Sequence, residues 1–371
     1  MPSLPAKRSW RILHSECSLG WGGQEHRVLA ELRGFQERGS EVRLLAPEQS
    51  QVFQRARAAG LPTKHLDVSR LRFPVQVVRL AAWLRKERIE VLNPHSSRDA
   101  WLLGVAGRLA RVPFIVRTRH IDVDYPNRWL SRHAFTALAD HVITTSGKIT
   151  KHFQEIFGLS ANRISTLPTG IDLQRFHPAG PKAELAKNHP PGPLIGMISV
   201  LRSWKGHSTF LAAAQELVQS GFNGQFVIIG DGPIRSAIEA EIAALGLTQR
   251  VQLLGHREDV PEVLRALQAL VIASTRHEGI PQIGLQALAT ETPVIGSDVG
   301  GTPEIIRPGE TGRIFPSADS RALAQAIQET LTDEPATILL AKRGRTMVEQ
   351  HHSLDHMLEK LEALYRRHLP L

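Results

Sequence analysis

The chain has 371 residues, and single hydrophobic cores rarely grow beyond about 250–300 residues, so two domains are expected. Hydrophobic residues make up 42%, which excludes a disordered or collagen-like chain, and the one cysteine, Cys17, excludes an intrachain disulfide and a cysteine-rich metal centre. The net charge of +9 lies in the first half, because residues 1–180 hold 27 Lys and Arg against 15 Asp and Glu, whereas residues 181–371 hold 18 against 21.

Short runs rich in Val, Ile and Leu alternate with amphipathic stretches along the chain. Such runs are typical of strands buried on both faces of a parallel sheet, so the pattern predicts an α/β fold. The predicted strands are residues 10–14, 42–46, 91–93, 114–117, 141–145, 194–200, 225–229, 251–254, 269–273 and 293–296. The predicted helices include residues 25–38, 75–86, 208–220, 234–244 and 321–331.

The alternation pauses at residues 173–193, which carry five prolines after His177 and no apolar run. This segment is typical of a linker. It predicts an N-terminal domain at 1–180 and a C-terminal domain at 181–350, each a Rossmann-like doubly wound unit. Two such domains facing each other across a cleft is the simplest architecture, with ligands bound beyond the C-terminal ends of the strands.

Two loops of the second half carry residues suited to phosphate. Arg202 and Lys205 lie in SVLRSWKG after a predicted strand and can neutralise a diphosphate, or they can simply be a solvated loop. The turn from Gly230 to Pro233 reads GDGP, which fits either a phosphate-binding turn or a tight turn from strand to helix.

A third loop reads STRHEGIPQIGLQ and begins after another predicted strand. Glu278 can hold a sugar hydroxyl, and the Gly279 turn at a helix N-terminus offers backbone N–H groups to an anion. Gln286 lies eight residues beyond Glu278, about two helical turns if the segment is helical, and can bind ribose. Gly300 and Gly301 would let the backbone approach a ligand closely.

In this order, the motifs resemble the C-terminal half of GT-B glycosyltransferases of glycosyltransferase family 4. The resemblance extends over the N-terminal half through Gly22-Gly23, Asn93-Pro94-His95, His120, Thr145-Ser146 and PTGID at 168–172. The segments GGQE, TRH, LRSWKGH and EGIPQ also resemble those of the family branch that builds bacterial surface polysaccharides and lipopolysaccharide core.

The resemblance implies roles for individual residues. His120 and Glu278 would be catalytic, with His120 near the anomeric carbon and Glu278 on the transferred sugar. The other implied contacts are Gly22, Gly23, Arg202 and Lys205 with the donor diphosphate; Gly279, Ile280, Gln282 and Ile283 with sugar and phosphate; Gln286, Gly230, Gly255 and His256 with the nucleoside; and His95 and Arg119 with the acceptor. The helix at 351–371 would pack back on the N-terminal domain.

The resemblance also implies a reaction. A hexose or acetamido-hexose would move from a nucleotide diphosphate sugar, with UDP expected, to a glycolipid or polysaccharide precursor such as lipopolysaccharide core, with retention of anomeric configuration. No metal and no cofactor are expected, because cations and helix dipoles stabilise the leaving diphosphate in this family. A sugar-nucleotide epimerase or hydrolase of the same fold is the alternative.

Three positions depart from the family pattern. Gln286 stands where Glu is usual, Pro281 replaces a common glycine and supplies no N–H, and Val200 stands where Arg is frequent, which leaves Arg202 as its substitute.

Residues 55–88 contain nine Lys and Arg against two acidic residues, and Val75, Val78, Ala82 and Trp83 give the predicted helix an apolar stripe. This pattern fits docking on an anionic membrane, or a helix packed on its own sheet by that stripe.

No nucleic-acid partner is expected, since aromatic residues make up only 5% and no binding motif is present. Without an apolar signal segment or spanning run, we expect a cytoplasmic protein, free or peripheral on the inner membrane.

Three further patterns do not predict a metal site or a nucleophile. Asp122-Val123-Asp124 matches a short metal motif, but we interpret it as a loop that can contact the acceptor. His352 and His356 are predicted to share one solvated helix face, and Cys17 is predicted to be a packing residue and not a nucleophile.

Overall fold

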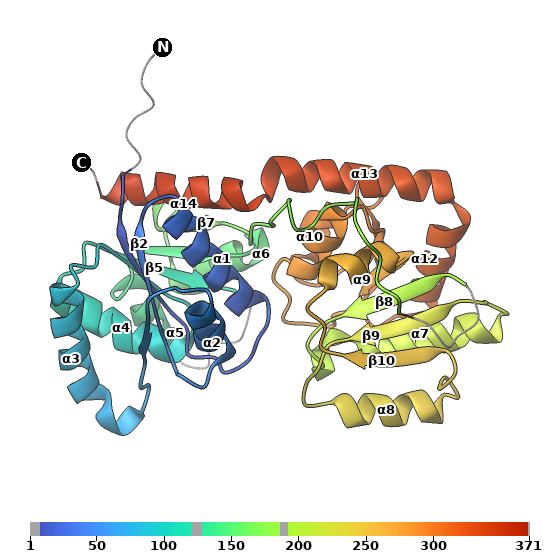
Figure 1. Cartoon of the computed structure of the whole chain (residues 1–371), viewed down its shortest axis with the longest axis horizontal. Helices are drawn as coiled ribbons and strands as arrows, with labels where there is room; N and C mark the ends of the chain where they lie inside the picture. The colour runs from blue at the N-terminus through green and yellow to red at the C-terminus, as the bar shows by residue number, and fades with distance from the viewer. Residues whose placement is uncertain (1–7, 121–127, 186–191, 370–371) are drawn as a thin grey trace, which may run out of the picture. The chain divides into compact units, whose positions relative to one another are not determined.

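The computed structural model describes residues 8–120, 128–185 and 192–369, and the chain forms two compact units (Figure 1). Unit 1 comprises Met1–Gly170 and Leu354–Leu371, and unit 2 comprises Ile171–Ser353. The observed division after Gly170 precedes the expected one after residue 180. Backbone hydrogen bonds explain the difference, because the Ile171 N–H donates to the His352 carbonyl and the Ala183 N–H donates to the Glu262 carbonyl, both within unit 2.

Unit 1 contains a seven-stranded sheet in the order β3-β2-β1-β4-β5-β6-β7, and every pair in it is parallel. Its strands are β1 (Arg11–Ser15), β2 (Glu41–Ala46), β3 (Thr63–His65), β4 (Val91–Pro94), β5 (Phe114–Arg119), β6 (His141–Thr144) and β7 (Ile164–Thr166). Its helices are α1 (Gly23–Glu37), α2 (Gln51–Ala58), α3 (Phe73–Lys86), α4 (Ser97–Ala110), α5 (Arg128–Thr136), α6 (Gly147–Phe157) and α14 (Leu354–His368), with 3₁₀ turns at Arg70–Arg72 and Ala161–Arg163.

The strands of unit 1 are buried on both faces. In β1, Ile12 belongs to a core with α1, α2 and α14, whereas Leu13 belongs to a second core with α3 and α4. Successive strand residues point to opposite faces, so one apolar run fills both cores. α14 covers the first core with Leu358 and Tyr365, and Arg38 of α1 is ion-paired to Glu362 at 3.0 Å.

Unit 2 contains a six-stranded parallel sheet in the order β10-β9-β8-β11-β12-β13. Its strands are β8 (Leu194–Ile198), β9 (Gln225–Ile229), β10 (Val251–Gly255), β11 (Ala269–Ile272), β12 (Val294–Ser297) and β13 (Arg313–Phe315). Its helices are α7 (His207–Gln219), α8 (Arg235–Ala244), α9 (Val260–Ala266), α10 (Gln282–Ala289), α11 (Thr302–Ile305), α12 (Ser320–Thr332) and α13 (Glu334–His351), with a 3₁₀ turn at Ser203–Lys205.

Unit 2 has the same two-sided burial. Phe226 of β9 packs with α7, α8 and α12, and the adjacent Val227 packs with α9, α10 and α13. Both units therefore have the predicted doubly wound α/β fold. Every predicted strand and each of the five predicted helices is found within two residues of its expected bounds.

One predicted helix is wrong. His352 and His356 do not share a helix, because α13 ends at His351 and α14 begins at Leu354. His352 is the C-cap of α13, where its N–H donates to the Val348 carbonyl. The break between the two helices coincides with the division between the units.

Candidate active site

The strand order of unit 2 reverses between β8 and β11, and the loops that follow these two strands carry the predicted donor residues. Ligands of doubly wound sheets bind at such a switch point. Lys205, after β8, places its Nζ 2.7 Å from Oε2 of Glu278, after β11. Ser274 donates its hydroxyl to the same carboxylate oxygen at 2.5 Å. The structure thus joins Lys205 and Glu278, and it adds Ser274, the first residue of the STRHEGIPQIGLQ loop.

Gly206 allows Lys205 to reach this position. Its φ of +77° is in the left-handed region, and a Cβ built there would lie 1.8 Å from the Ala273 carbonyl oxygen. Only glycine combines this conformation with so close an approach. The loop therefore passes directly over the end of β11 before α7 begins.

The Glu278 turn leads into α10 as expected, but only part of the segment from Glu278 to Gln286 is helical. α10 begins at Gln282, with Pro281 as its N-cap, so Glu278 lies before the helix and Gln286 lies within it, partly exposed. The first N–H groups of a helix lack an acceptor within it and face its N-terminal end; in α10 these belong to Gln282 and Ile283, since the Gly284 N–H donates to the Pro281 carbonyl at 3.0 Å. Gly279 and Ile280 precede that end of α10, and Gln282 and Ile283 are its first two residues.

Gly300 and Gly301 lie against the turn of the chain that carries Glu278. The N–H of Gly301 donates to the carbonyl oxygens of Glu278 and Gly279, at 3.3 and 3.2 Å. The close backbone approach expected for a ligand is therefore made by the Glu278 turn. This contact fixes the turn that carries Glu278.

Arg202 does not join the ion pair. Its side chain is exposed, and its guanidinium carbon lies 5.2 Å from the centre of the Trp204 ring. Nearby, His207 Nε2 lies 3.2 Å from the Ser199 hydroxyl, and burial together with the Lys205 charge lowers the pKa of His207 to about 4. His207 is therefore neutral at physiological pH.

The GDGP turn follows β9 and is a tight turn from strand to helix. A Cβ on Gly230 would lie 1.8 Å from the Ser199 carbonyl oxygen, so the glycine is required by the packing of two loops. The Gly230 N–H donates to the Gly255 carbonyl at 2.8 Å, and the neighbouring His256 is exposed, with Nε2 4.0 Å from Glu258. These three residues share one end of the sheet, beside the Arg202 loop.

Unit 1 has its own switch point, between β1 and β4. Gly22 is the N-cap of α1, and its N–H donates to Glu25 at 2.9 Å; Gly23 begins the helix and is exposed. The preceding loop is held by Glu16, whose buried carboxylate accepts from Ser96 and Gln24.

A second buried acid, Asp99, accepts from the Ser15 hydroxyl at 2.7 Å. Burial, and next the charge of Glu16, raise the pKa of Asp99 to about 8. Burial also raises the pKa of Glu16. Close to neutral pH this pair of acids therefore retains a proton beneath the glycine loop.

Cys17 lies in the same loop as Glu16. Burial and the nearby Asp99 and Glu16 carboxyls raise the pKa of its thiol to about 11, so almost none of it is thiolate at neutral pH. This agrees with the interpretation of Cys17 as a packing residue.

His95 and His120 follow β4 and β5 and lie in contact. His95 Nδ1 is 2.9 Å from His120 Nε2, and His95 Nε2 is 2.8 Å from Nδ1 of His14 in β1. Both ring nitrogens of His95 are thus engaged within unit 1. Arg119 is the buried last residue of β5, and the Asp122–Asp124 motif lies outside the described residues.

Among the described residues, His14, Glu31 and His95 are the one group whose ligand atoms lie close enough to share a metal ion. Their chemistry does not suit one. Arg27 already supplies a cation there, with its Nε 2.6 Å from Glu31, and His14 and His95 are bonded to each other.

Comparison with known proteins agrees with the two-unit architecture and with the motifs. Residues 21–175 match the model of Glycosyltransferase Family 4, and residues 192–333 match that of Glycosyl transferases group 1. The chain belongs to the family 4 glycosyltransferases. The ion pair of Lys205 and Glu278 lies in the group 1 region, and His120 lies in the family 4 region.

Two curated relatives illustrate this membership. The chain is 26% identical over 330 residues to the UDP-Gal:alpha-D-GlcNAc-diphosphoundecaprenol alpha-1,3-galactosyltransferase of Escherichia coli, covering 83% of each chain. It is 28% identical over 245 residues to the lipopolysaccharide core biosynthesis mannosyltransferase LpcC of Rhizobium leguminosarum bv. viciae, covering 64% of this chain and 66% of the relative. A glycosyltransferase from Rickettsia africae has the same GT-B fold, with a TM-score of 0.88, 19% identity and coverage of 98% and 99%.

The basic segment of this glycosyltransferase includes α3, whose orientation differs from one of the two expectations. α3 packs inward through Val77, Leu80, Ala81 and Leu84. Of the predicted stripe, Val75, Val78 and Ala82 are exposed, whereas Trp83 is partly buried against the same core. Leu71, in the preceding turn, is 97% exposed. The packing explanation for this stripe is therefore wrong for Val75, Val78 and Ala82 and is confirmed for Trp83.

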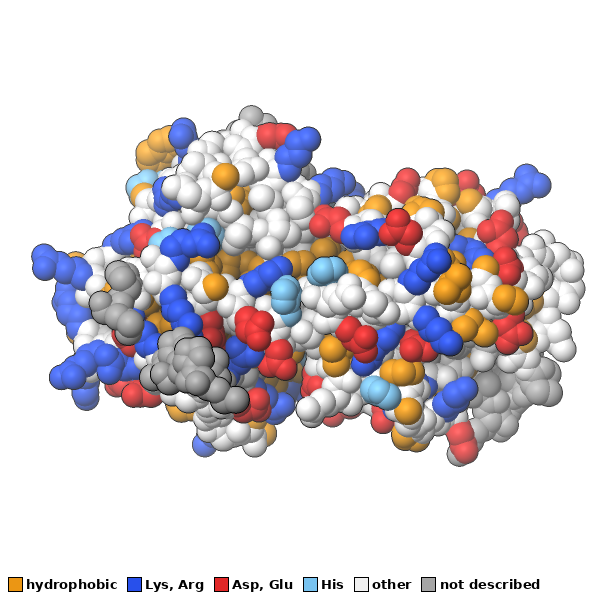
Figure 2. Space-filling model, turned by 90° about the horizontal axis from the view of Figure 1, so that it is seen from above, with side chains coloured by type: hydrophobic (Ala, Val, Ile, Leu, Met, Phe, Trp, Pro, Cys, Tyr) orange, Lys and Arg blue, Asp and Glu red, His pale blue; other side chains and the backbone are white. Residues whose placement is uncertain are grey.

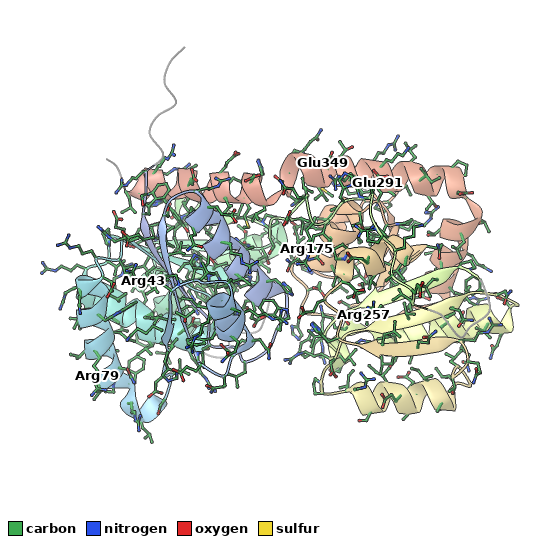
Figure 3. The ribbon with its side chains drawn as sticks, in the orientation of Figure 1. Arg43, Arg79, Arg175, Arg257, Glu291 and Glu349 are labelled. Carbon is green, nitrogen blue, oxygen red and sulfur yellow. The ribbon has the colours of Figure 1, made fainter. Side chains whose placement is uncertain are left out.

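Basic side chains accompany the exposed stripe. Arg79 projects from α3 (Figure 3), and Lys and Arg side chains crowd the end of unit 1 at the left of Figure 2. Among the described residues, no helix is both long and apolar enough to cross a membrane.

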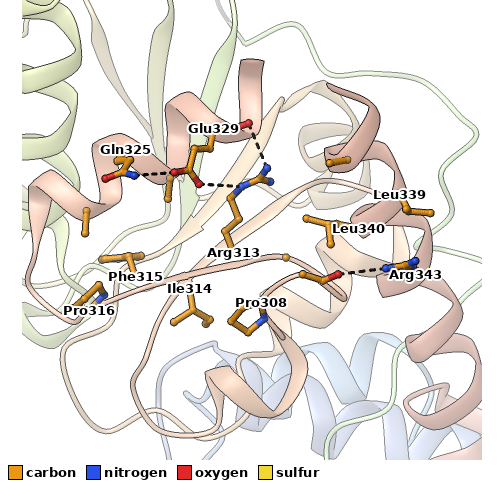
Figure 4. Close-up of a pocket in the computed structure, with 15 residues that line it drawn as sticks. Pro308, Arg313, Ile314, Phe315, Pro316, Gln325, Glu329, Leu339, Leu340 and Arg343 are labelled. Carbon is orange, nitrogen blue, oxygen red and sulfur yellow. Dashed lines mark hydrogen bonds and ion pairs between the residues drawn. The ribbon is translucent and has the colours of Figure 1, made fainter. Parts of the chain in front are cut away.

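A separate pocket of about 540 Å³ lies in unit 2 between β13, α12 and α13 (Figure 4). Its lining includes none of the predicted site residues. Its two arginines are engaged, since Arg313 pairs with Glu329 at 3.7 Å and Arg343 donates to the Gly309 carbonyl at 3.3 Å. We assign it no part in catalysis.

Proposed function

We propose that this glycosyltransferase moves a hexosyl or acetamido-hexosyl group from a UDP-sugar to a glycolipid or polysaccharide precursor such as lipopolysaccharide core, with retention of anomeric configuration. One observation carries the proposal: the Lys205–Glu278 ion pair at the switch point of unit 2. A cation and a carboxylate at this point suit the two halves of a nucleotide sugar, a diphosphate and a polyhydroxylated ring.

The donor groups needed for a diphosphate are present in unit 2. The Lys205 ammonium has three N–H donors, and the ion pair with Glu278 leaves others for phosphate oxygens. Arg202 is exposed on the same loop, and the first N–H groups of α10 add the positive end of a helix dipole. We assign Gln286, Gly230, Gly255 and His256 to the nucleoside.

The relatives support the donor and acceptor classes. One is named for UDP-Gal and a diphosphoundecaprenol-linked sugar, and the other for mannose transfer in lipopolysaccharide core. Both names describe the transfer of a sugar, galactose in the first and mannose in the second. They therefore support the class of reaction that we propose, the transfer of a sugar to a precursor of the cell surface.

In unit 1 we assign Gly22 and Gly23, at the N-terminus of α1, to the donor diphosphate and His120 to the region of the anomeric carbon. Arg119, the last residue of β5, is assigned to the acceptor. The transfer is proposed to need no metal, because Lys205, Arg202 and two helix N-termini already offer positive charge to the leaving group.

The proposed step needs no side chain as a base. The acceptor oxygen forms a bond to the anomeric carbon on the face from which the diphosphate leaves, and the bond from that carbon to the phosphate oxygen breaks. The acceptor's proton passes to the departing phosphate oxygen. Lys205 and the α10 N–H groups stabilise the charge that develops on the diphosphate.

We further propose that α3 docks this enzyme on an anionic membrane surface. The outward stripe of Val75, Val78 and Ala82, together with Leu71, offers apolar side chains to lipid, and Arg79 offers positive charge to anionic headgroups. This placement would bring the enzyme to lipid-linked acceptors on the cytoplasmic face of the inner membrane.

Product analysis tests the function. The full chain is incubated with UDP-glucose, UDP-galactose, UDP-N-acetylglucosamine or GDP-mannose, with and without a lipid-linked or lipopolysaccharide-core acceptor, and products are identified by mass spectrometry and NMR. We expect glycosylated acceptor with the anomeric configuration of the donor. Epimerised or hydrolysed donor without dependence on acceptor would overturn the proposal, and an inverted product would overturn retention.

A further inference from the structure

Three histidines from successive neighbouring strands form a row in unit 1. His14 lies in β1, His95 follows β4 and His120 follows β5, and these strands are adjacent in the sheet. The rings stack, with centroids 5.1 Å apart for His14 and His95 and 5.2 Å apart for His95 and His120. Two nitrogen-to-nitrogen contacts of 2.8 and 2.9 Å connect the row.

The three rings are neutral at physiological pH. Burial is the main cause that lowers the pKa of each, and the charge of Arg27 acts in the same direction on all three. A neutral imidazole has one N–H and one bare nitrogen. In each contact one ring must therefore donate and the other accept. Because the central His95 has one N–H, it donates to one neighbour and accepts from the other, so both hydrogen bonds of the row point the same way.

The surroundings of His14, at the buried end of the row, set the direction of hydrogen-bond donation. His14 Nδ1 lies 3.7 Å from Oε2 of Glu31, whose carboxylate is held by Arg27. A proton on Nδ1 is attracted by Glu31 and is shared with His95, whereas Nε2 of His14 has no hydrogen-bond partner among the described residues. A buried N–H without an acceptor is costly, so the Nδ1–H form of His14 is favoured.

The remaining protons follow from this choice. His14 Nδ1–H donates to His95 Nε2, and His95 must then carry its proton on Nδ1 and donate it to His120 Nε2. His120 is left with its proton on Nδ1. Among the described residues that N–H has no acceptor, so it can donate to a ligand that reaches His120.

We propose that His14 and His95 are positioning residues that hold His120 as the neutral Nδ1–H form, so that His120 presents a hydrogen-bond donor, and not a base, to the substrate. The inference rests on the proposed function for its consequence in catalysis, but the proton arrangement itself does not depend on it. Glu31 and Arg27 anchor the row, and Arg119 and Tyr365 are the other ionisable groups that bear on it.

Nitrogen-15 NMR of histidine-labelled full chain tests the arrangement without any substrate. Long-range proton–nitrogen spectra distinguish the Nδ1–H and Nε2–H forms, and the signals of His120 are assigned by their loss in His120→Phe. We expect Nδ1–H for His120. The Nε2–H form, or a charged ring at pH 7, would overturn the inference whatever the enzyme's activity.

Two substitutions at His14 test the positioning role. His14→Asn retains an N–H donor near the position of Nδ1, whereas His14→Leu, of similar size, removes it. We expect His14→Leu to mix the two forms of His120 and to lower kcat about tenfold or more with the donor KM unchanged, by analogy with groups that orient metal-bound histidines. His14→Asn should restore both the NMR form and most of kcat.

The outcomes separate the two proposals. If His14→Leu leaves both the His120 form and kcat unchanged, the row has no positioning role. If the wild-type chain transfers no sugar but His120 carries its proton on Nδ1 and loses this form in His14→Leu, the proposed function fails and the proton arrangement stands. Thermal unfolding of each variant verifies that the fold is intact.

Discussion

Lys205 and Glu278 lie 73 residues apart in sequence, and their side chains meet at 2.7 Å where the strand order of unit 2 reverses. Glu278 is largely buried and also accepts from Ser274. A buried carboxylate held by a cation and a hydroxyl is fixed in direction before any ligand arrives. Such preorganisation is what a transferase needs at the sugar and diphosphate of its donor.

Glu278→Gln should abolish most activity and leave the fold intact. The amide is of nearly the same size but lacks the charge that orients Lys205, so we expect kcat to fall about 10²–10³-fold, the cost of removing one preorganised group elsewhere. Steady-state kinetics and thermal unfolding measure the two effects. Glu310→Gln, at an exposed pair with Arg307, is the control and should behave as wild type. Equal activity of the two variants would refute the assignment of Glu278.

Gly206→Ala should destabilise unit 2 and disrupt the donor loop. The new Cβ would lie 1.8 Å from the Ala273 carbonyl oxygen, so the loop must move away from the end of β11. We expect a loss of more than about 2 kcal/mol in the free energy of unfolding.

Gly221→Ala is the matched control for Gly206→Ala. Its φ of +90° is also left-handed, but no atom lies within 4 Å of the new Cβ, so only the backbone cost of about 1–2 kcal/mol applies. Urea unfolding compares the two variants. An equal loss of stability in both would contradict the close approach described at Gly206.

Asp99 should make stability depend on pH. Its pKa is about 8 in the folded chain against 3.8 for an unperturbed carboxyl, so the folded state binds the proton more tightly. The stabilisation that the Asp99 proton gives to the folded state is therefore complete below about pH 4 and is lost as the pH rises through 8. Between pH 6 and 9 we expect wild type to lose about 2 kcal/mol more than Asp99→Asn, which stays neutral.

Urea unfolding at pH 6, 7, 8 and 9 measures this difference. Asp333→Asn is the control, because Asp333 caps α13 at the surface and Asn caps a helix about equally well. Its pH profile should follow wild type. Parallel profiles for wild type and Asp99→Asn would show that Asp99 is not protonated in the folded chain.

Val78→Glu should weaken binding to anionic vesicles. It places a negative charge in the outward stripe of α3, beside Arg79, where both apolar and electrostatic attraction are lost. We expect at least about a fivefold weaker association in sedimentation with vesicles of phosphatidylglycerol and phosphatidylcholine, since one such residue contributes about 1 kcal/mol or more.

Ile338→Glu is the control for the vesicle experiment, because Ile338 is also an exposed apolar residue but lies on α13 in unit 2. It should bind vesicles as wild type does. If Val78→Glu binds as well as wild type, the membrane surface does not include α3.

Most strands were predictable because a strand that is buried on both faces of a sheet is a continuous apolar run, which is recognisable in the sequence alone. The missed strands are β3, β7 and β13, each of three residues at a sheet edge. β3 has the sequence Thr-Lys-His, which buries little and resembles a loop. Such strands are specified by their neighbours in the sheet and not by their own residues.

The site was predictable where motifs carry it and not elsewhere. Lys205 and Glu278 belong to recognisable loops, whereas His14 and Glu31 lie inside a strand and a helix with no local signal, and only the fold brings them to His95. α3 offers two apolar stripes, and the larger one, with Leu80 and Leu84, packs inward. Hydrophobic periodicity alone does not decide which of two stripes is buried.

A thermal-shift titration of wild type and Lys205→Ala with UDP, GDP, ADP and NAD is the most direct test of donor binding in unit 2. A ligand that binds only the folded chain stabilises it by about 2.7 kcal/mol at a hundredfold excess over its Kd. We predict that one nucleoside diphosphate, UDP, raises the Tm of wild type and not of Lys205→Ala. A shift with NAD alone, or an equal UDP shift in both proteins, would contradict a nucleotide-sugar site at Lys205.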